Sequence, residues 1–375
     1  MRPIYLDYNA TTPVDPQVLE AMLPFFKEHF GNPSSGHAYG LEARRAVEKA
    51  RKQMACLLQC SPDEVIFTSG GTESNNTVLF GVAQALMNKG RHIVTAKIEH
   101  PSVLEPCIEL MCRGFDVSFV PVDKNGLVDP DDLRRAIRPD TVLVSVMHAN
   151  NEIGTIQPLG KISKITRERG ILLHTDAAQS AGKIPVGTDL LGVDFMTIAG
   201  HKLYAPKGIG ALYCKNGASF GKLMFGAGQE RGVRPGTENV PYIVGLGEAA
   251  DIAGRMLAEE IKRLEKLRNR LEERILEALP DAVIHGRNAP RLPNTLSVGF
   301  PGRLAYDIVN GLADKVAISA GAACHSRDVR ISHVLQAIQA PEDVAKGTVR
   351  ISLGRFTTED EIDQAAEQII KVVKK

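Results

Sequence analysis

The sequence is poor in cysteine, carries almost no excess charge and lacks long apolar runs. Six cysteines in 375 residues are too few for a disulfide framework, which favours a reducing compartment. Lys and Arg total 45 against 44 Asp and Glu, so composition gives no electrostatic sign of a nucleic-acid or anionic-membrane surface. No segment approaches the roughly 18 consecutive apolar residues of a membrane span. The opening stretch MRPIYLDYNATTP is polar and turn-rich, unlike a signal peptide. We therefore expect a cytoplasmic protein that binds neither nucleic acid nor a membrane.

Cysteines with metal-ligand spacing are equally scarce. Cys56 and Cys60 are four residues apart, and a pair without a second pair makes a poor zinc site, so packing is favoured over metal binding. Cys107, Cys112 and Cys214 lack the CxxC spacing and are expected to be structural. The sequence predicts no resident metal ion.

Short apolar segments alternate with helical patterns over most of the chain. This alternation predicts an α/β fold with a mostly parallel sheet covered by helices on both faces. The expected strands are residues 64–69, 92–97, 116–122, 141–149, 170–177, 194–200 and 210–214, with amphipathic segments such as 77–90 and 159–170 between them.

The pattern changes towards the C-terminus. A long helical pattern runs from about Val244 to Leu279, and after Pro280 three strand-like segments, LPNTLSVGF, KVAISAG and TVRISLGR, precede a helix from Thr358. We expect a large domain at residues 13–255. The prediction for the rest, residues 1–12 and 256–375, is a smaller α+β domain.

Three segments supply what pyridoxal phosphate (PLP) requires of a protein. PLP needs a lysine for a Schiff base, a carboxylate that keeps the ring nitrogen protonated, and a phosphate cradle. Lys202 and Asp176 each follow a predicted strand, and ligands of open α/β sheets bind at the carboxyl ends of strands. The glycines of SGGTESNN precede Thr72 and a predicted helix, whose free N–H groups and dipole favour a phosphate. Taken singly, Asp176 is also consistent with a helix cap, Lys202 with a surface lysine and the glycine-rich segment with a plain turn.

Ten motifs extend this interpretation over nearly the whole chain. The sequence resembles the cysteine desulfurases of the NifS/IscS type, which are aspartate-aminotransferase-like, fold-type-I PLP-dependent transferases. The resemblance rests on YLDYNATTP (5–13), GNPSS (31–35), FTSGGTESNN (67–76), EHPS (99–102), NNEIG (150–154), HTDAAQS (174–180), GHKLYAPKGIGALY (200–213), QERGVRPGTEN (229–239), GAACHS (321–326) and VRISLGRFTTEDEID (349–363).

The resemblance assigns roles to individual residues. It implies that Lys202 forms the Schiff base, that Asp176 pairs with the pyridine nitrogen and that His100 stacks on the ring and moves protons. It implies that Arg350 grips the substrate carboxylate, as a bidentate guanidinium can, with Asn32 on the same side. The remaining implied cofactor contacts are Asn151 and Gln179 beside the ring, Gly71, Thr72 and His201 at the phosphate, and Thr237 contributed across a homodimer interface.

Cys324 lies in SAGAACHS, among small residues that permit exposure. The residues alone leave open whether it is a small buried residue or a nucleophile on an exposed, polar loop. The resemblance implies a catalytic thiol that takes the sulfur of L-cysteine as a persulfide, leaving L-alanine. It further implies transfer of that sulfur to an acceptor or iron–sulfur scaffold protein, with Cys324 a candidate transient ligand of an iron–sulfur cluster.

One position departs from the pattern of many desulfurases. Ala199 stands where they carry the serine of an S-G-H-K run, which removes one hydroxyl contact to the phosphate, worth about 0.5–1.5 kcal/mol. An apolar residue here, together with GQERGVRPGTEN and GAACHS, also resembles selenocysteine lyases, so release of selenide from L-selenocysteine is an alternative activity. A PLP-dependent aminotransferase on the same fold is a second alternative, because fold alone does not fix the reaction.

Overall fold

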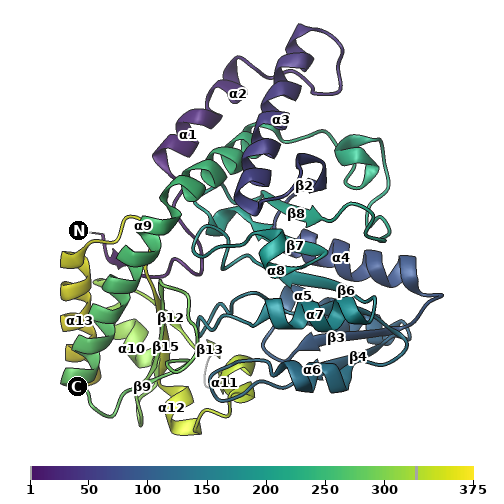
Figure 1. The fold of residues 1–375 in the computed structure, drawn as a ribbon. Coiled ribbons are helices and arrows are strands. Elements are labelled where there is room, and N and C mark those ends of the chain that lie inside the picture. Colours follow the sequence, from purple (N-terminus) through teal and green to yellow (C-terminus); the bar gives the residue numbers. More distant parts are fainter. Residues whose placement is uncertain (1, 326–327) are drawn as a thin grey trace.

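A computed structural model describes residues 2–325 and 328–375, with the side chains of all of these except 322–330. The two largest sheets of the described residues have seven and four strands, and helices cover each of them (Figure 1).

The large sheet has seven strands in the order β2-β8-β7-β6-β5-β3-β4. The strands from β7 to β4 in this order are parallel, whereas β8 is antiparallel to both of its neighbours. This topology confirms the predicted mostly parallel sheet. The strands are β2 (Val65–Thr68), β3 (His92–Ala96), β4 (Asp116–Val120), β5 (Thr141–Ser145), β6 (Leu172–Asp176), β7 (Phe195–Ala199) and β8 (Gly210–Cys214).

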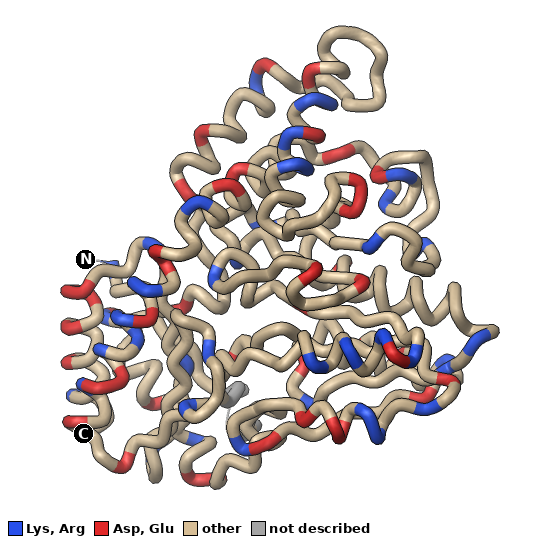
Figure 2. The backbone as a smooth tube through the Cα atoms, in the orientation of Figure 1, with Lys and Arg blue, Asp and Glu red and all other residues tan. Residues whose placement is uncertain are grey.

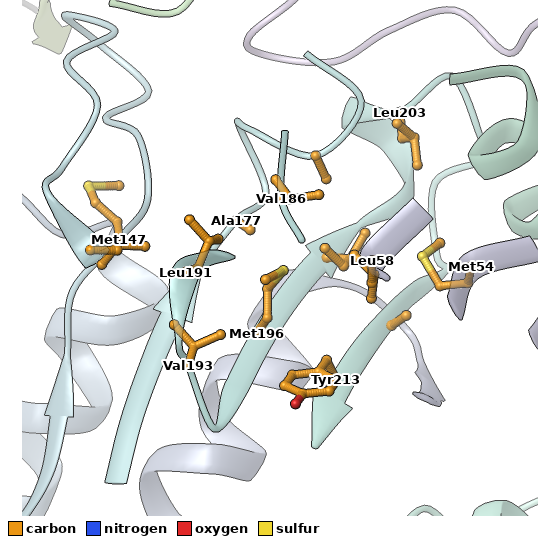
Figure 3. Close-up of a cluster of buried hydrophobic side chains, with 14 of the residues drawn as sticks. Met54, Leu58, Met147, Ala177, Val186, Leu191, Val193, Met196, Leu203 and Tyr213 are labelled. Carbon is orange, nitrogen blue, oxygen red and sulfur yellow. The ribbon is translucent and has the colours of Figure 1, made fainter. Parts of the chain in front are cut away.

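Alternate residues of these strands enter different hydrophobic cores. Phe195 of β7 packs with α4 and α5 on one face, whereas Met196 faces α3 and α7 on the other. Figure 3 shows part of this second core, where Met54 and Leu58 of α3 approach Met196 and Tyr213. Because both faces are buried, the strands read as continuous apolar runs, which explains why the sequence located them.

The helices of this part of the chain either cross between strands or pack on the sheet. Helices α1, α2 and α3 lie at the top of Figure 1, and α3 packs on one face of the sheet. The helices are α1 (Pro16–Met22), α2 (Pro24–Lys27), α3 (Ala38–Leu58), α4 (Gly71–Leu86), α5 (Pro101–Cys112), α6 (Pro130–Ala136), α7 (Leu159–Glu168) and α8 (Thr188–Leu191), with 3₁₀ turns η1 (Pro62–Glu64), η2 (Gly200–Lys202) and η3 (Gln229–Gly232).

The small sheet has the order β12-β15-β10-β9, and all of its pairings are antiparallel. The N-terminal strand β1 pairs with β11 beside it, so the first residues lie against the C-terminal part of the chain. The elements are β1 (Ile4–Tyr5), β9 (Val283–Ile284), β10 (Thr295–Gly299), α10 (Ala305–Leu312), β11 (Val316–Ala317), β12 (Ser319–Ala320), α11 (His333–Ala337), α12 (Glu342–Lys346), β15 (Thr348–Ser352) and α13 (Glu359–Val373).

Helix α9 (Val240–Ala278) connects the two sheets and begins earlier than the sequence predicts. Its buried residues from Val240 to Ala253 belong to the core of the large sheet, and those from Leu264 to Ile275 belong to the core of the small sheet. The domain division at residue 255 stays a prediction.

The segment around Cys324 differs from the predicted loop. Its backbone forms two short antiparallel strands, β13 (Ala322–His325) and β14 (Asp328–Ile331), with Cys324 opposite Val329. The alternation of Val329 and Ile331 with polar residues is a strand pattern that the sequence analysis missed.

Charged residues of both signs are mixed along the outer helices (Figure 2). Within the described residues, every helix is too short or too polar to cross a membrane. In the same residues, no three His, Cys, Asp or Glu side chains come together in a way that suits a metal ion.

Candidate active site

A pocket of about 450 Å³ lies at the carboxyl ends of β3, β5, β6 and β7. This is the edge of a parallel sheet at which ligands bind. It collects most of the residues that the sequence singled out, although they are far apart in the chain. The lining is Asn9, Ala10, Gly71, Thr72, His100, Ser102, Met147, Ala149, Asn151, Asp176, Ala178, Gln179, Ala199, His201, Lys202 and Arg350.

Lys202 enters this central pocket from η2, directly after β7. Its Nζ donates hydrogen bonds to the backbone carbonyls of Asn9 and Ala10. The amine is therefore held by the N-terminal segment, at the point where the large sheet meets it.

The surroundings of Lys202 favour its neutral form. Burial, followed by the positive charge of Arg350, lowers the pKa of Lys202 to about 8, while the carboxylates of Asp7 and Asp176 oppose this shift. A lysine with a pKa near 8 supplies an unprotonated amine close to neutral pH, as a Schiff-base nucleophile requires.

Asp176 is the last residue of β6 and is only 6% exposed. Its Oδ1 accepts a hydrogen bond from the N–H of Ala178 at 2.9 Å, and its Oδ2 accepts one from Nδ2 of Asn75 at 2.8 Å. These donors fix the carboxylate at the base of the pocket, where it can pair with a protonated ring nitrogen.

His100 caps the N-terminus of α5, four residues after the last residue of β3, Ala96. Its Nδ1 accepts a hydrogen bond from the N–H of Ser102 at 3.1 Å and lies 2.8 Å from the Ser102 hydroxyl. The ring is open towards the pocket. A planar ligand beside it can therefore stack on the imidazole.

The start of α4 forms an anion cradle. Gly70, the N-cap, has φ of 151° and ψ of −177°, a conformation that favours glycine, and no side chain caps this helix start. Thr72 and His201 line the same side, and burial followed by the charge of Lys202 lowers the pKa of His201 to about 4. Ala199 lies beside Gly71, since a Cβ added to that glycine would sit 3.5 Å from the Ala199 Cβ.

Asn9 organises the pocket and was given no role from the sequence, although its motif YLDYNATTP had been noted. Its carbonyl oxygen accepts hydrogen bonds from both Lys202 and Gln179, the latter at 3.0 Å. Its Nδ2 donates to Thr295 of the small sheet at 2.8 Å and to the carbonyl of Asn151 at 3.1 Å. Sequence reasoning missed Asn9 because these partners lie 142 to 286 positions away in the chain, and such long-range contacts leave no local signal.

Arg350 reaches the pocket from β15 of the small sheet. Its Nη2 donates to Oδ1 of Asp7 at 2.9 Å and to the Ser319 hydroxyl at 3.1 Å, and its Nη1 donates to the carbonyl of Asn151 at 3.2 Å. Its buried Nε has no hydrogen-bond partner among the described residues. The guanidinium thus brings a positive charge from the small sheet to the wall of the pocket.

Two predicted site residues lie outside this pocket, and the side chain of a third is not among the described residues. Asn32 and Thr237 are exposed and do not line the central pocket. Their neighbours Pro33, Ser34 and Glu238 line a separate groove of about 810 Å³. The side chain of Cys324 lies outside the described residues, so its predicted catalytic role stays a prediction.

Comparison with known proteins identifies relatives along the full chain. The cysteine desulfurase IscS of Dictyoglomus turgidum is 47% identical over 375 residues, covering 100% of this chain and 95% of that relative. The cysteine desulfurase of Mus musculus is 45% identical over 378 residues, covering 100% of this chain and 82% of that relative.

Solved structures of similar proteins match this chain over nearly its full length. A NifS-like protein superposes with a TM-score of 0.93 at 41% identity and full coverage of both chains. A structure described as SspA in complex with cysteine gives a TM-score of 0.82 at 35% identity, covering 95% of this chain and 100% of that one.

The aminotransferase class-V profile matches residues 4–365. With these relatives, it confirms the predicted fold type, and such homologues imply a PLP cofactor. The chain belongs to the aminotransferase class-V family, among the NifS/IscS-type cysteine desulfurases.

Proposed function

We propose that this chain is a PLP-dependent cysteine desulfurase that converts L-cysteine to L-alanine and holds the sulfur as a persulfide on Cys324. The observation that carries the proposal is the central pocket, where Lys202, Asp176 and His100 surround one space beside the cradle at the start of α4.

The pocket residues fit PLP. The uncapped start of α4 suits the phosphate, with Gly71, Thr72 and His201 as its contacts. Asp176 suits the ring nitrogen and Lys202 suits the aldehyde carbon. When bound, PLP supplies an electron sink for negative charge at the substrate Cα. The other proposed contacts are His100 on the ring face and Asn151 and Gln179 at its edge.

Lys202 is the proposed base for the Cα proton. Its pKa of about 8 leaves part of the Nζ population unprotonated near neutral pH. The carbonyls of Asn9 and Ala10 can hold Nζ at the pocket wall whenever the amine is not joined to the cofactor.

Arg350 is the proposed anchor for the substrate carboxylate. Its contacts with Asp7 and Ser319 fix the guanidinium plane, and its positive charge in the pocket wall attracts a carboxylate. Binding the carboxylate on this side directs the amine of cysteine towards Lys202. Asn32 is proposed to assist, although the single chain does not bring it into the pocket.

Cys324 is the proposed sulfur acceptor. Its thiolate attacks the Sγ of the substrate, so that an S–S bond forms while the Cβ–Sγ bond breaks and its electron pair stays with the carbon fragment. That fragment is protonated and leaves as alanine. The persulfide then passes its outer sulfur to a thiol of an acceptor or scaffold protein.

The first experiment measures alanine and sulfide released from L-cysteine in the presence of a thiol reductant. We expect Cys324→Ala to lose release of both while keeping the bound, yellow cofactor. Cys56→Ala, which removes an exposed thiol, is the matched control and should behave as wild type. L-selenocysteine is run in parallel. Wild-type protein that ignores cysteine but releases selenide would replace the proposal with a selenocysteine lyase.

We further infer a homodimer in which Thr237 of a second copy completes the phosphate cradle. In support, Thr237 is exposed, and its segment shares the 810 Å³ groove with Pro33 and Ser34, next to Asn32. Mixing Lys202→Ala chains with Thr237→Ala chains should restore activity, because some sites then combine two intact contributions. A monomer by light scattering would contradict this inference.

We place the enzyme in the cytoplasm, where reduced thiols are maintained, and the five described cysteines are all free.

A further inference from the structure

One ring nitrogen of His100, Nδ1, lies within hydrogen-bond distance of two groups of Ser102. Ser102 lies on the first turn of α5, and its backbone N–H donates to Nδ1 of His100 at 3.1 Å. The Ser102 hydroxyl lies 2.8 Å from the same nitrogen. A hydroxyl can donate or accept, so its direction depends on its other partner.

That other partner is Asn75 of α4, whose side chain is fully buried. Its Nδ2 lies 2.8 Å from the Ser102 hydroxyl and 2.8 Å from Oδ2 of Asp176. An ionised carboxylate only accepts, so the amide must turn its NH₂ group towards Asp176. The second N–H of that group then points at the hydroxyl of Ser102, which therefore accepts from Asn75.

The direction of the whole chain follows. Since the Ser102 hydroxyl accepts from Asn75, its own proton is free to go to Nδ1 of His100. This nitrogen then receives two donors, the hydroxyl and the backbone N–H, and carries no proton of its own. We propose that Asn75 and Ser102 are positioning residues that use the Asp176 carboxylate to hold His100 as the neutral tautomer protonated at Nε2.

This tautomer decides what His100 can do in the pocket. With Nδ1 occupied, Nε2 is the ring nitrogen left for ligands, and it presents an N–H. His100 therefore acts as a hydrogen-bond donor of the resting enzyme and not as its base, which leaves abstraction of the Cα proton to Lys202. The inference rests on the proposed function in assigning these roles, but the tautomer itself does not depend on activity.

The charges around His100 are consistent with a neutral ring. Burial lowers the pKa of His100, and the charges of Lys202 and His333 lower it further, while Asp176 acts in the opposite direction. The imidazole of His201 also lies within electrostatic reach. Protonation at Nδ1 would in addition bring its N–H against two other donors, the hydroxyl and the backbone N–H of Ser102. The hydrogen bonds of Ser102 therefore oppose protonation at this nitrogen.

The test is ¹⁵N–¹H correlation spectroscopy of the holoenzyme with ring-labelled histidine, in which the His100 signals are identified by their loss in His100→Gln. We expect wild-type His100 to show a proton on Nε2 and none on Nδ1 from pH 6 to 9. Ser102→Ala removes one donor to the unprotonated Nδ1, which destabilises the neutral form, so the pKa of His100 should rise by about 0.5–1 pH unit. Ser102→Thr keeps the hydroxyl and should restore the wild-type titration.

The chain offers a matched control. Ser145 makes a buried hydrogen bond of the same length, 2.8 Å, to Nδ1 of His174, away from the central pocket lining. Ser145→Ala should change the His174 signals and leave those of His100 unchanged. A wild-type His100 protonated at Nδ1, or identical His100 titrations in Ser102→Ala and wild type, would overturn the proposal. Both results are readable even in a protein that does not act on cysteine.

Discussion

Lys183 is a charged residue buried beside the pocket without a role in the proposed chemistry. Its side chain is only 8% exposed, and its Nζ donates to Oε1 of Gln179 at 3.0 Å and to Oδ1 of Asn9 at 3.4 Å. Burial, followed by the charges of Lys202 and Arg350, lowers the pKa of Lys183 to about 7. The hydrogen bond to Oε1 leaves Nε2 of Gln179 as the donor, so Lys183 orients this amide.

The lowered pKa of Lys183 predicts a pH dependence of stability. Between pH 7 and about 10.5, the unfolded chain binds a proton at this lysine and the folded chain does not, so the free energy of unfolding should rise with pH across this window. Lys183→Met removes this contribution and should flatten the rise, as measured by urea unfolding at several pH values. Lys161→Met, which changes an exposed lysine, should keep the wild-type slope. Equal slopes in both variants would contradict the assignment.

At the scale of elements, a buried ion pair fastens the segment that carries Thr237. Arg51 of α3 donates to both carboxylate oxygens of Glu230 in η3, at 2.8 and 2.7 Å, and the N–H of Phe67 donates to Glu230 at 2.8 Å. Glu230 and Arg231 adopt φ of 44° and 57°, which is unfavourable for residues other than glycine. The ion pair therefore holds this turn in a conformation that its backbone alone would not choose.

Breaking this pair from one side should be costly. Glu230→Ala or Arg51→Met leaves the other charge buried and unpaired, and each should lower the free energy of unfolding by about 3–5 kcal/mol. The double variant should lose less than the sum of the two, because no unpaired charge remains. Urea unfolding of the four proteins gives the coupling directly. The exposed pair Lys266 and Glu359 is the control, and Glu359→Ala should have a much smaller effect. Additive losses at Arg51 and Glu230 would contradict the argument.

The sequence predicts the elements of the large sheet better than the contacts between them. All seven strands of the large sheet were predicted, because a sheet buried on both faces imposes continuous apolar runs. Lys202 and Asp176 were placed correctly at strand ends, since the position of a residue after a strand is a local property. The Arg51–Glu230 pair joins residues 179 positions apart, and such pairing has no local signal. The contacts of Asn9 were missed for the same reason.

At the scale of the whole molecule, α9 is the one continuous element shared by both hydrophobic cores within the described residues. Ala253 is buried in the core of the large sheet and Leu264 in that of the small sheet, and the turns between them are largely exposed. Arg350 reaches the pocket from the small sheet and Lys202 from the large one. The geometry of the pocket therefore depends on how firmly α9 and the Asn9 contacts hold the two parts together.

A proline in the exposed stretch of α9 tests whether the chain divides near residue 255. Ala258 is exposed and outside both cores, so Ala258→Pro removes a helix hydrogen bond and kinks or breaks α9 there, at a cost of about 3 kcal/mol or more. If the helix transmits cooperativity between two domains, this variant should unfold in two steps where wild type unfolds in one, as followed by circular dichroism in urea. Ala258→Gly costs only about 1 kcal/mol and keeps the hydrogen bond, so it should retain a single transition at slightly lower urea. The opposite outcome is a single transition of the proline variant, shifted as a whole to lower urea. That result would show that the contacts of the N-terminal segment with both sheets are enough to couple the two parts of the chain. The boundary predicted at residue 255 would then not separate independent folding units.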